Sequence, residues 1–279
     1  RRRFLRASAT GLLIVPAWVV GRGQQPPPSQ RLNLAAIGAG GKGESDIEGV
    51  APGNNIVALC DVDPGRAATS LKRFPDAKRY SDFRRMFDEM EKSIDAVTIS
   101  TPDHMHFPAA MWAMRRGKHV LVQKPLTHSM WEARQLTLAA REHKVVSKMG
   151  NQGQASEDTR RLIEFLRGGA IGTVREIHYW TNRPIWPQGV ARPADTPPVP
   201  ANLAWPSWIG VAPERPYHPA YHPFKWRGWW DFGTGALGDI GCHTINPAFC
   251  ALGEMKGAFS VEAETSPYTD ETFPSWSIV

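Results

Sequence analysis

The chain has 279 residues, of which 42% are apolar and 22% charged. This globular composition excludes a disordered tail, a collagen-like fibre and a polytopic membrane protein. Three cysteines exclude a disulfide scaffold and a cysteine-rich zinc module. At roughly 100–200 residues per domain, the length predicts one large domain or two modest ones.

The net charge of +6 lies mostly at the start of the chain. Residues 1–30 hold five arginines and no acid, and residues 31–279 hold 28 basic and 27 acidic residues. A basic leader is not a basic binding face, so we expect no nucleic-acid partner.

Residues 1–30 have the pattern of an export leader. The cationic start RRRFLR is followed by an apolar run over 11–20, which is too short to span a bilayer, and by a Gln/Pro-rich linker. Paired arginines before Phe-Leu resemble a twin-arginine signal, a route that carries folded proteins. We expect a protein exported folded, periplasmic or tethered outside the membrane only through an uncleaved leader. A basic stretch before a buried helix is the alternative.

A glycine-rich loop follows the first predicted strand, over residues 33–38. Gly38, Gly40 and Gly43 form G-x-G-x-x-G ahead of a helix expected from about Glu44. These glycines allow a tight turn, a close approach of a pyrophosphate to the backbone, and close packing of helix on strand. The helix N-terminus would then hold the pyrophosphate. The candidate cofactor-binding residues here are Gly38, Gly40, Gly41 and Gly43.

A second apolar strand, over residues 56–60, ends in Asp61, 23 residues after Gly38. An acid at this position hydrogen-bonds the adenosine ribose and repels a 2′-phosphate. We therefore expect NAD as the cofactor, with NADP less favoured. The alternative is that Asp61 simply ends a strand at a turn.

Strands and helices continue to alternate over residues 31–152, with further strands predicted at 96–100, 119–122 and 145–149. The alternation predicts a doubly wound parallel α/β sheet, a Rossmann domain, whose ligands bind beyond the carboxyl ends of the strands. Polar residues that follow these strands lie at 38–43, Asp61, 101–106, 123–125 and Asn151.

Residues 153–279 predict a second domain. A helix is expected over 156–166 and a strand over 174–181, whereas 11 prolines in residues 184–223 disfavour regular structure there. Seven of the 11 tryptophans lie between Trp180 and Trp230. Their rings either form a wall against the C–H faces of a sugar or anchor a loop that lacks backbone pairing.

Asp239 and His243 follow a glycine-rich stretch at i and i+4, which places them on one face if that turn is helical. Histidine titrates near neutral pH and suits proton transfer from an alcohol. A neighbouring carboxylate can orient the ring or bind a substrate hydroxyl. A helix-capping or surface pair is the alternative.

Asp103, His104 and His106, or Asp239 and His243, are residue types that could ligate a metal ion. No strong zinc spacing is present, so we expect no metal.

Four motifs together resemble the glucose–fructose oxidoreductase, inositol dehydrogenase and MocA-type (Gfo/Idh/MocA) family. They are the glycine loop, Thr101-Pro102-x-x-x-His106, Gln123-Lys124-Pro125 and the GDIGCH run at 238–243, and the match covers about residues 33–252. With the leader, the chain resembles the exported branch of that family. The resemblance implies hydride transfer between NAD(P) and a secondary alcohol of a sugar or polyol. It also implies a homo-oligomer and a second α/β domain with an open, mostly antiparallel sheet.

The matching positions imply roles for individual residues. His243 is the implied general base or acid, Lys124 the electrostatic stabiliser and proton relay, and Asp239 the orienter and substrate ligand. The implied cofactor contacts, besides the glycine loop and Asp61, are Thr101, Pro102, His106, Gln123 and Lys124. Asn151, which follows the last predicted strand, is a further candidate substrate contact. The sequence departs from the family at Gln123, where Glu is usual, and at Asn246, near a position that is often acidic.

Only 36 residues follow His243, with one strand expected at 258–264 and the start of another at 276–279. A sheet of the usual 5–6 strands cannot be built from them, so we expect a fragment that lacks much of its second sheet. Two other functions stay open: an NAD-dependent glycosidase acting by transient oxidation and elimination, and a non-catalytic NAD-binding protein.

Overall fold

A computed structural model of the chain describes residue 27 and residues 30–253 and 257–279. The leader expected over residues 1–30 falls almost wholly outside these described residues. Within them, no helix is both long and apolar enough to cross a membrane.

Six parallel strands form the main sheet, in the order β3-β2-β1-β4-β5-β6. The strand order reverses at the β1–β4 pair, which is where a doubly wound sheet opens a crevice for a ligand. The strands are β1 (Asn33–Ile37), β2 (Asn55–Cys60), β3 (Lys78–Tyr80), β4 (Ala96–Ile99), β5 (His119–Gln123) and β6 (Ser147–Gly150).

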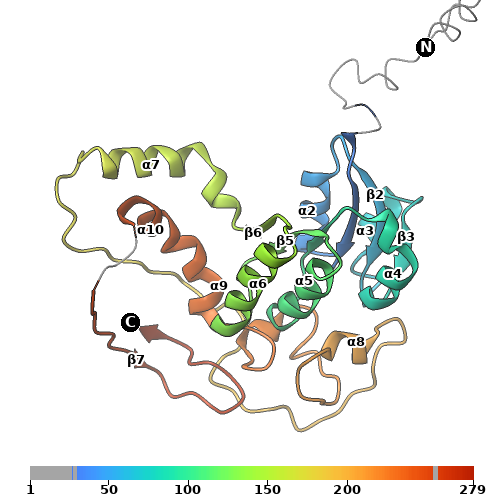
Figure 1. Ribbon diagram of the computed structural model, residues 1–279. Helices are drawn as coiled ribbons and strands as arrows, with labels where there is room; N and C mark the ends of the chain where they lie inside the picture. The colour runs from blue at the N-terminus through green and yellow to red at the C-terminus, as the bar shows by residue number, and fades with distance from the viewer. Residues whose placement is uncertain (1–26, 28–29, 254–256) are drawn as a thin grey trace, which may run out of the picture.

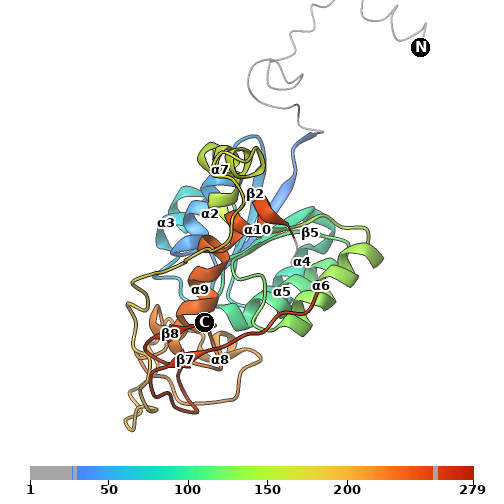
Figure 2. The same cartoon turned by 90° about the vertical axis from the view of Figure 1, so that its left-hand side faces the viewer.

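Helices cover both faces of this sheet, with α2 and α3 on one side and α4, α5 and α6 on the other (Figure 2). Alternate residues of one strand enter different cores: Ala35 and Ile37 pack on one face, and Ala36 packs on the other. The predicted Rossmann domain is therefore confirmed. The helices are α2 (Lys42–Val50), α3 (Ala68–Arg73), α4 (Phe83–Met90), α5 (His106–Met114) and α6 (Met130–Glu142).

Local sequence explains where several helices begin. At α6, Ser129 and Glu132 form a capping box, in which each side chain accepts a hydrogen bond from the other residue's backbone N–H. Asp82 caps α4 by accepting from the Arg84 N–H at 2.8 Å.

The rest of the chain wraps around one end of the sheet with little regular structure (Figure 1). The predicted helix at 156–166 is confirmed as α7 (Glu157–Arg167), which packs beside α10 (Asn246–Leu252). This part of the chain also contains η4 (Gln152–Ala155), α8 (Trp205–Ile209), the short 3₁₀ turn η5 (Lys225–Gly228), α9 (Gly235–Thr244), β7 (Glu264–Thr265) and β8 (Ser277–Ile278).

The expected open, mostly antiparallel sheet is wrong for the described residues, where only β7 and β8 pair antiparallel outside the main sheet. Residues 174–181 form no strand, and the strand expected at 258–264 shrinks to Glu264–Thr265. A strand needs a partner for its N–H and C=O groups, and no described backbone group pairs with residues 173–187. Alternating hydrophobicity alone does not supply that partner.

The proline-rich segment forms no strand and is held mainly by an aromatic cluster, with a few backbone hydrogen bonds such as that from Ala204 N–H to the Val62 carbonyl oxygen. Trp205 and Trp208 stack with ring centroids 4.7 Å apart, and Trp229 and Phe232 are almost completely buried beside them. Most tryptophans of this segment are therefore loop anchors. Trp208 and Trp226 belong to the cluster and also line the cleft described below.

Candidate active site

A cleft of about 650 Å³ opens at the carboxyl ends of the parallel strands, between the glycine loop and the aromatic cluster. It contains most of the residues that the sequence singled out, but Gly43, His106, Asn151 and His243 do not line it. The predicted residues that do line it are Gly38, Gly40, Gly41, Asp61, Thr101, Pro102, Gln123, Lys124 and Asp239.

The glycine loop leaves no room for side chains. Gly38 has φ +81°, and a Cβ on it would lie 2.6 Å from the carbonyl oxygen of Ser100 on the neighbouring strand end. A Cβ on Gly43 would collide with the carbonyl oxygen of Gly38, so only glycine lets α2 pack this closely on β1. The exposed backbone at the start of α2 fits the pyrophosphate of a dinucleotide.

Asp61 fastens the end of β2 to this loop. One of its carboxylate oxygens accepts hydrogen bonds from the N–H groups of Ala39 at 2.8 Å and Gly40 at 2.9 Å, and the other accepts from Asp63 N–H at 2.9 Å. Burial raises the pKa of Asp61, and these N–H donors oppose that shift. The carboxylate therefore lines the cleft and holds the loop at once.

Asp46, on α2, accounts for the unusual Gln123. The Gln123 side-chain amide donates to both oxygens of Asp46, at 2.9 and 3.1 Å, and Ser100 Oγ donates to the same carboxylate at 2.7 Å. Lys42 completes the group as an ion-pair partner of Asp46. A glutamate at position 123 would face a second carboxylate, so the amide is the residue type that Asp46 requires.

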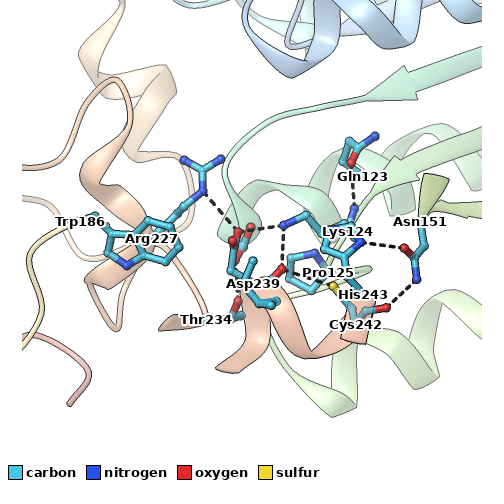
Figure 3. A network of polar contacts seen from close by, with 12 residues as sticks. Gln123, Lys124, Pro125, Asn151, Trp186, Arg227, Thr234, Asp239, Cys242 and His243 are labelled. Carbon is cyan, nitrogen blue, oxygen red and sulfur yellow. Dashed lines mark hydrogen bonds and ion pairs between the residues drawn. The ribbon is translucent and has the colours of Figure 1, made fainter. Parts of the chain in front are cut away.

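Lys124 and Asp239 form the polar centre of the cleft (Figure 3). Lys124 Nζ lies 2.9 Å from Asp239 Oδ1 and donates to the Asp239 carbonyl oxygen at 2.8 Å. Arg227 Nε lies 3.3 Å from the same Oδ1 atom. The Asp239 carboxylate is therefore shared between two cations from different segments.

The ring of His243 is held by Asn151, and not by Asp239 as we expected from their spacing. Asn151 Nδ2 donates to the Cys242 carbonyl at 2.6 Å, so its Oδ1 faces His243 Nδ1, at 2.9 Å, and must accept (Figure 3). Burial, helped by the charge of Lys124, lowers the pKa of His243, which favours the neutral ring. Its proton is then on Nδ1, and the lone pair is on Nε2.

His106, an expected cofactor contact, does not line the cleft. The ring is buried, with Nδ1 2.7 Å from the Pro125 carbonyl oxygen and Nε2 2.9 Å from that of Thr101. It ties the end of β5 to the end of β4, and burial lowers its pKa to about 4. The side chain therefore helps to position Thr101, which lines the cleft.

His104 fastens the aromatic cluster to the sheet. Its ring nitrogens lie 3.1 Å from the Trp208 carbonyl oxygen and 3.3 Å from that of Phe232. Since the ring nitrogens of both buried histidines face backbone carbonyls, neither offers a free lone pair to a metal. No group of three or more metal-ligating side chains occurs among the described residues.

Fold and cleft together place the chain among the Rossmann-type dinucleotide-binding proteins. Comparison with family models identifies the family. Residues 32–151 match an oxidoreductase family described as an NAD-binding Rossmann fold, and residues 173–279 match the C-terminal alpha/beta domain of that family. The chain belongs to the Gfo/Idh/MocA oxidoreductase family.

Curated relatives include two sugar dehydrogenases. A levoglucosan dehydrogenase of Pseudarthrobacter phenanthrenivorans is 25% identical over 83% of this chain and 54% of the relative. A D-glucoside 3-dehydrogenase of Escherichia coli is 25% identical over 81% of this chain and 55% of the relative. The chain thus spans about half the length of these relatives.

Among solved structures, an inositol dehydrogenase homolog from Azotobacter vinelandii, complexed with NADH and myo-inositol, is similar with a TM-score of 0.47 and 24% identity. The similarity covers 53% of this chain and 42% of that one.

Arg227 and Asp46 are not among the site residues predicted from the sequence. Arg227 lies among aromatic residues, 12 positions before Asp239. An arginine in an irregular aromatic segment of this kind is a sequence signal that could have marked it as a candidate site residue. Asp46 carries no comparable signal, because an acid in the first turns of a helix is ordinary.

Proposed function

We propose that the protein transfers a hydride between NAD and a secondary alcohol of a sugar or polyol. One observation carries the proposal: Lys124 at the end of β5 meets Asp239 of α9 inside the cleft that the glycine loop borders. The names of the two sugar dehydrogenases among the relatives support the same substrate class.

The cleft residues fit a dinucleotide. Gly38, Gly40 and Gly41 would hold the pyrophosphate, and Thr101, Pro102 and Gln123 would border the nicotinamide end, where the bound cofactor supplies the hydride acceptor. Asp61 favours NAD over NADP, because a carboxylate at the end of β2 repels a 2′-phosphate.

The chain's own groups then handle the hydroxyl. The Lys124 ammonium donates to the substrate oxygen and stabilises the negative charge that develops there as hydride leaves the carbon. His243 does not line the cleft, but its ring lies beside Lys124 (Figure 3), and its Nε2 would accept the hydroxyl proton of a substrate held by that lysine. Asn151 Oδ1 accepts a hydrogen bond from Nδ1–H, which leaves the lone pair on Nε2. Asp239 holds Lys124 in place and accepts from a neighbouring substrate hydroxyl.

The cellular setting is a proposal from sequence alone. The pattern of residues 1–30 supports export in folded form to the periplasm or the outer side of the membrane, and the family resemblance supports a homo-oligomer.

A substrate panel tests the function. The purified protein is incubated with NAD⁺ and a panel of sugars, sugar acids and polyols while absorbance at 340 nm reports NADH, and chromogenic glycosides report cleavage. NADH formation from a free sugar, abolished in Lys124→Ala but retained in the exposed control Lys148→Ala, is the expected result. Glycoside cleavage without net NADH would favour the glycosidase instead. NAD binding without any turnover would contradict an enzyme.

A further inference from the structure

Arg227 presents part of its guanidinium to the cleft without a protein partner. Nε donates to Asp239 Oδ1 at 3.3 Å, and Nη1 donates to the Phe224 carbonyl oxygen at 3.0 Å. Nη2 has no hydrogen-bond or ion-pair partner among the described residues, and Figure 3 shows the two terminal nitrogens pointing away from Asp239. Three of its five N–H donors are therefore available to a ligand.

Aromatic rings hold this guanidinium in one place. Its central carbon lies 4.2 Å from the ring centroid of Trp226 and 4.6 Å from that of Phe224, and the side chain is 22% exposed. Stacking of this kind fixes the plane of the guanidinium. The available donors are thus pre-positioned beside Lys124, which contacts the same Asp239 oxygen.

Positive charge is in excess around this point. Lys124 and Arg227 share the single carboxylate of Asp239, and a third cation, Arg183, repels the charge of Arg227. The other acid, Asp103, is completely buried and hydrogen-bonded to Thr234, and burial raises its pKa to about 7, so at neutral pH it carries only part of a charge. Around Lys124 and Arg227, positive charge therefore exceeds negative charge.

We propose that the substrate is a sugar acid, and that Arg227 binds its carboxylate through the free edge of the guanidinium while Lys124 contacts the secondary alcohol. Two N–H groups on one edge of a guanidinium can donate parallel hydrogen bonds to the two oxygens of a carboxylate. A single hydroxyl group has only one oxygen and cannot accept both bonds in this geometry. The inference rests on the proposed function and narrows its substrate class to uronates and related sugar acids.

Arg227 could instead serve only to position Asp239. A purely positioning role predicts that every substrate suffers equally when the guanidinium is lost. A carboxylate-binding role predicts a selective loss, confined to substrates with a carboxylate. The two roles are therefore separated by a matched pair of charged and neutral sugars.

The experiment compares D-glucuronate and D-galacturonate with D-glucuronamide, D-glucose and D-galactose, using the full chain, Arg227→Gln and Arg227→Lys. Steady-state NADH formation gives kcat/KM, and tryptophan fluorescence gives Kd in the presence of NAD⁺, since Trp226 lies against the guanidinium. The control is Arg192→Gln, which removes an arginine of the same segment that pairs with Glu271.

We expect uronates to exceed their neutral counterparts at least about 10-fold in kcat/KM and in affinity. Arg227→Gln should lower both values for uronates by about 10- to 100-fold and those for neutral sugars by less than about threefold. Arg227→Lys should recover part of the lost kcat/KM and affinity for uronates. The control Arg192→Gln should leave the preference for uronates over neutral sugars unchanged in both kcat/KM and affinity.

Neutral sugars that reduce NAD⁺ while uronates neither bind nor react would overturn the inference and leave the dehydrogenase intact. An equal loss on charged and neutral sugars in Arg227→Gln would also overturn it. Uronate binding that depends on Arg227, without NADH from any sugar, would support the inference and contradict the proposed function.

Discussion

Lys124 and Asp239 are 115 residues apart in the chain, and their charged atoms lie 2.9 Å apart in the fold. One follows the fifth strand of the Rossmann sheet, and the other lies on α9, in the part of the chain that wraps around the sheet. The ion pair therefore joins the two parts of the molecule at the cleft.

Replacing Lys124 with methionine should lower kcat about 100- to 1,000-fold, since the ammonium is the donor placed to stabilise the developing alkoxide. NAD⁺ affinity should change less than about threefold, because most of the cleft residues proposed to hold the dinucleotide are untouched. Stopped assays give kcat, and calorimetric titration with NAD⁺ gives the affinity. Loss of NAD⁺ binding together with turnover would place Lys124 in cofactor binding instead.

Gln123→Glu should destabilise the protein by about 1–3 kcal/mol, because it sets two carboxylates within hydrogen-bond distance of one another beside β5. Urea unfolding followed by tryptophan fluorescence measures the free energy of unfolding. Asp46→Asn in the same chain should restore most of the loss, and Asp46→Asn alone completes the double-mutant cycle. A coupling energy near zero would mean that the amide–carboxylate contact does not constrain position 123.

The Asn151–His243 contact predicts the pH dependence of turnover. The lowered pKa of His243 means that the neutral base is present at pH 7 and is lost only as pH falls through a value below 6.5. Asn151→Asp places a carboxylate against Nδ1, which favours the imidazolium and should move the acid limb of kcat/KM to higher pH. Asn151→Leu should lower kcat about 10- to 100-fold through loss of ring orientation. An acid limb that stays in place in Asn151→Asp would exclude His243 as the titrating base.

Three buried neighbours predict how stability depends on pH. Burial lowers the pKa of His104 and of His106 from 6.5 to about 4, and it raises the pKa of Asp103 from 3.8 to about 7. Between pH 4 and pH 6.5, both histidines are protonated and the aspartate is ionised in the unfolded chain. In the folded chain both histidines are neutral and the aspartate is protonated. The histidines therefore contribute stability above pH 6.5 that is lost toward pH 4, and Asp103 contributes stability at low pH that is lost toward pH 7.

The unfolded state then binds one more proton from these groups, so the free energy of unfolding should fall by about 1.4 kcal/mol per unit as pH drops from 6.5 to 4. Urea titrations across this range measure the slope. His104→Gln removes one of the two histidines and should bring the slope from these groups close to zero. An unchanged slope in that variant would show that other groups control acid unfolding.

Asp61→Asn should weaken the preference for NAD. The amide removes the charge that opposes a 2′-phosphate but retains an oxygen that can accept from the Ala39 and Gly40 N–H groups. We expect the ratio of kcat/KM for NAD⁺ to that for NADP⁺ to fall about 10-fold. An unchanged ratio would mean that cofactor choice is decided elsewhere, and Arg66, which also borders the cleft, is the first residue to examine.

Local patterns in the sequence were sufficient to predict the Rossmann domain. Apolar strands, the glycine spacing after β1 and the acid after β2 each reflect contacts within a few residues or one neighbouring strand. The position of Lys124 at the end of β5 follows from the same alternation, because parallel strands present their carboxyl ends at one edge of the sheet.

Partners distant in sequence were decided only by the tertiary structure. Residues 174–181 have the alternation of a strand but no described neighbour to pair with, and the i, i+4 spacing of Asp239 and His243 did not predict that Asn151 would hold the ring. His106 belongs to a motif that predicted a cofactor contact, and it turned out to be buried between two carbonyls. Arg227 gained its place from the rings of Phe224 and Trp226 and from a carboxylate on another helix. The physical reason is that spacing along the chain fixes which face of an element a side chain occupies, whereas its partner is fixed by how the elements pack.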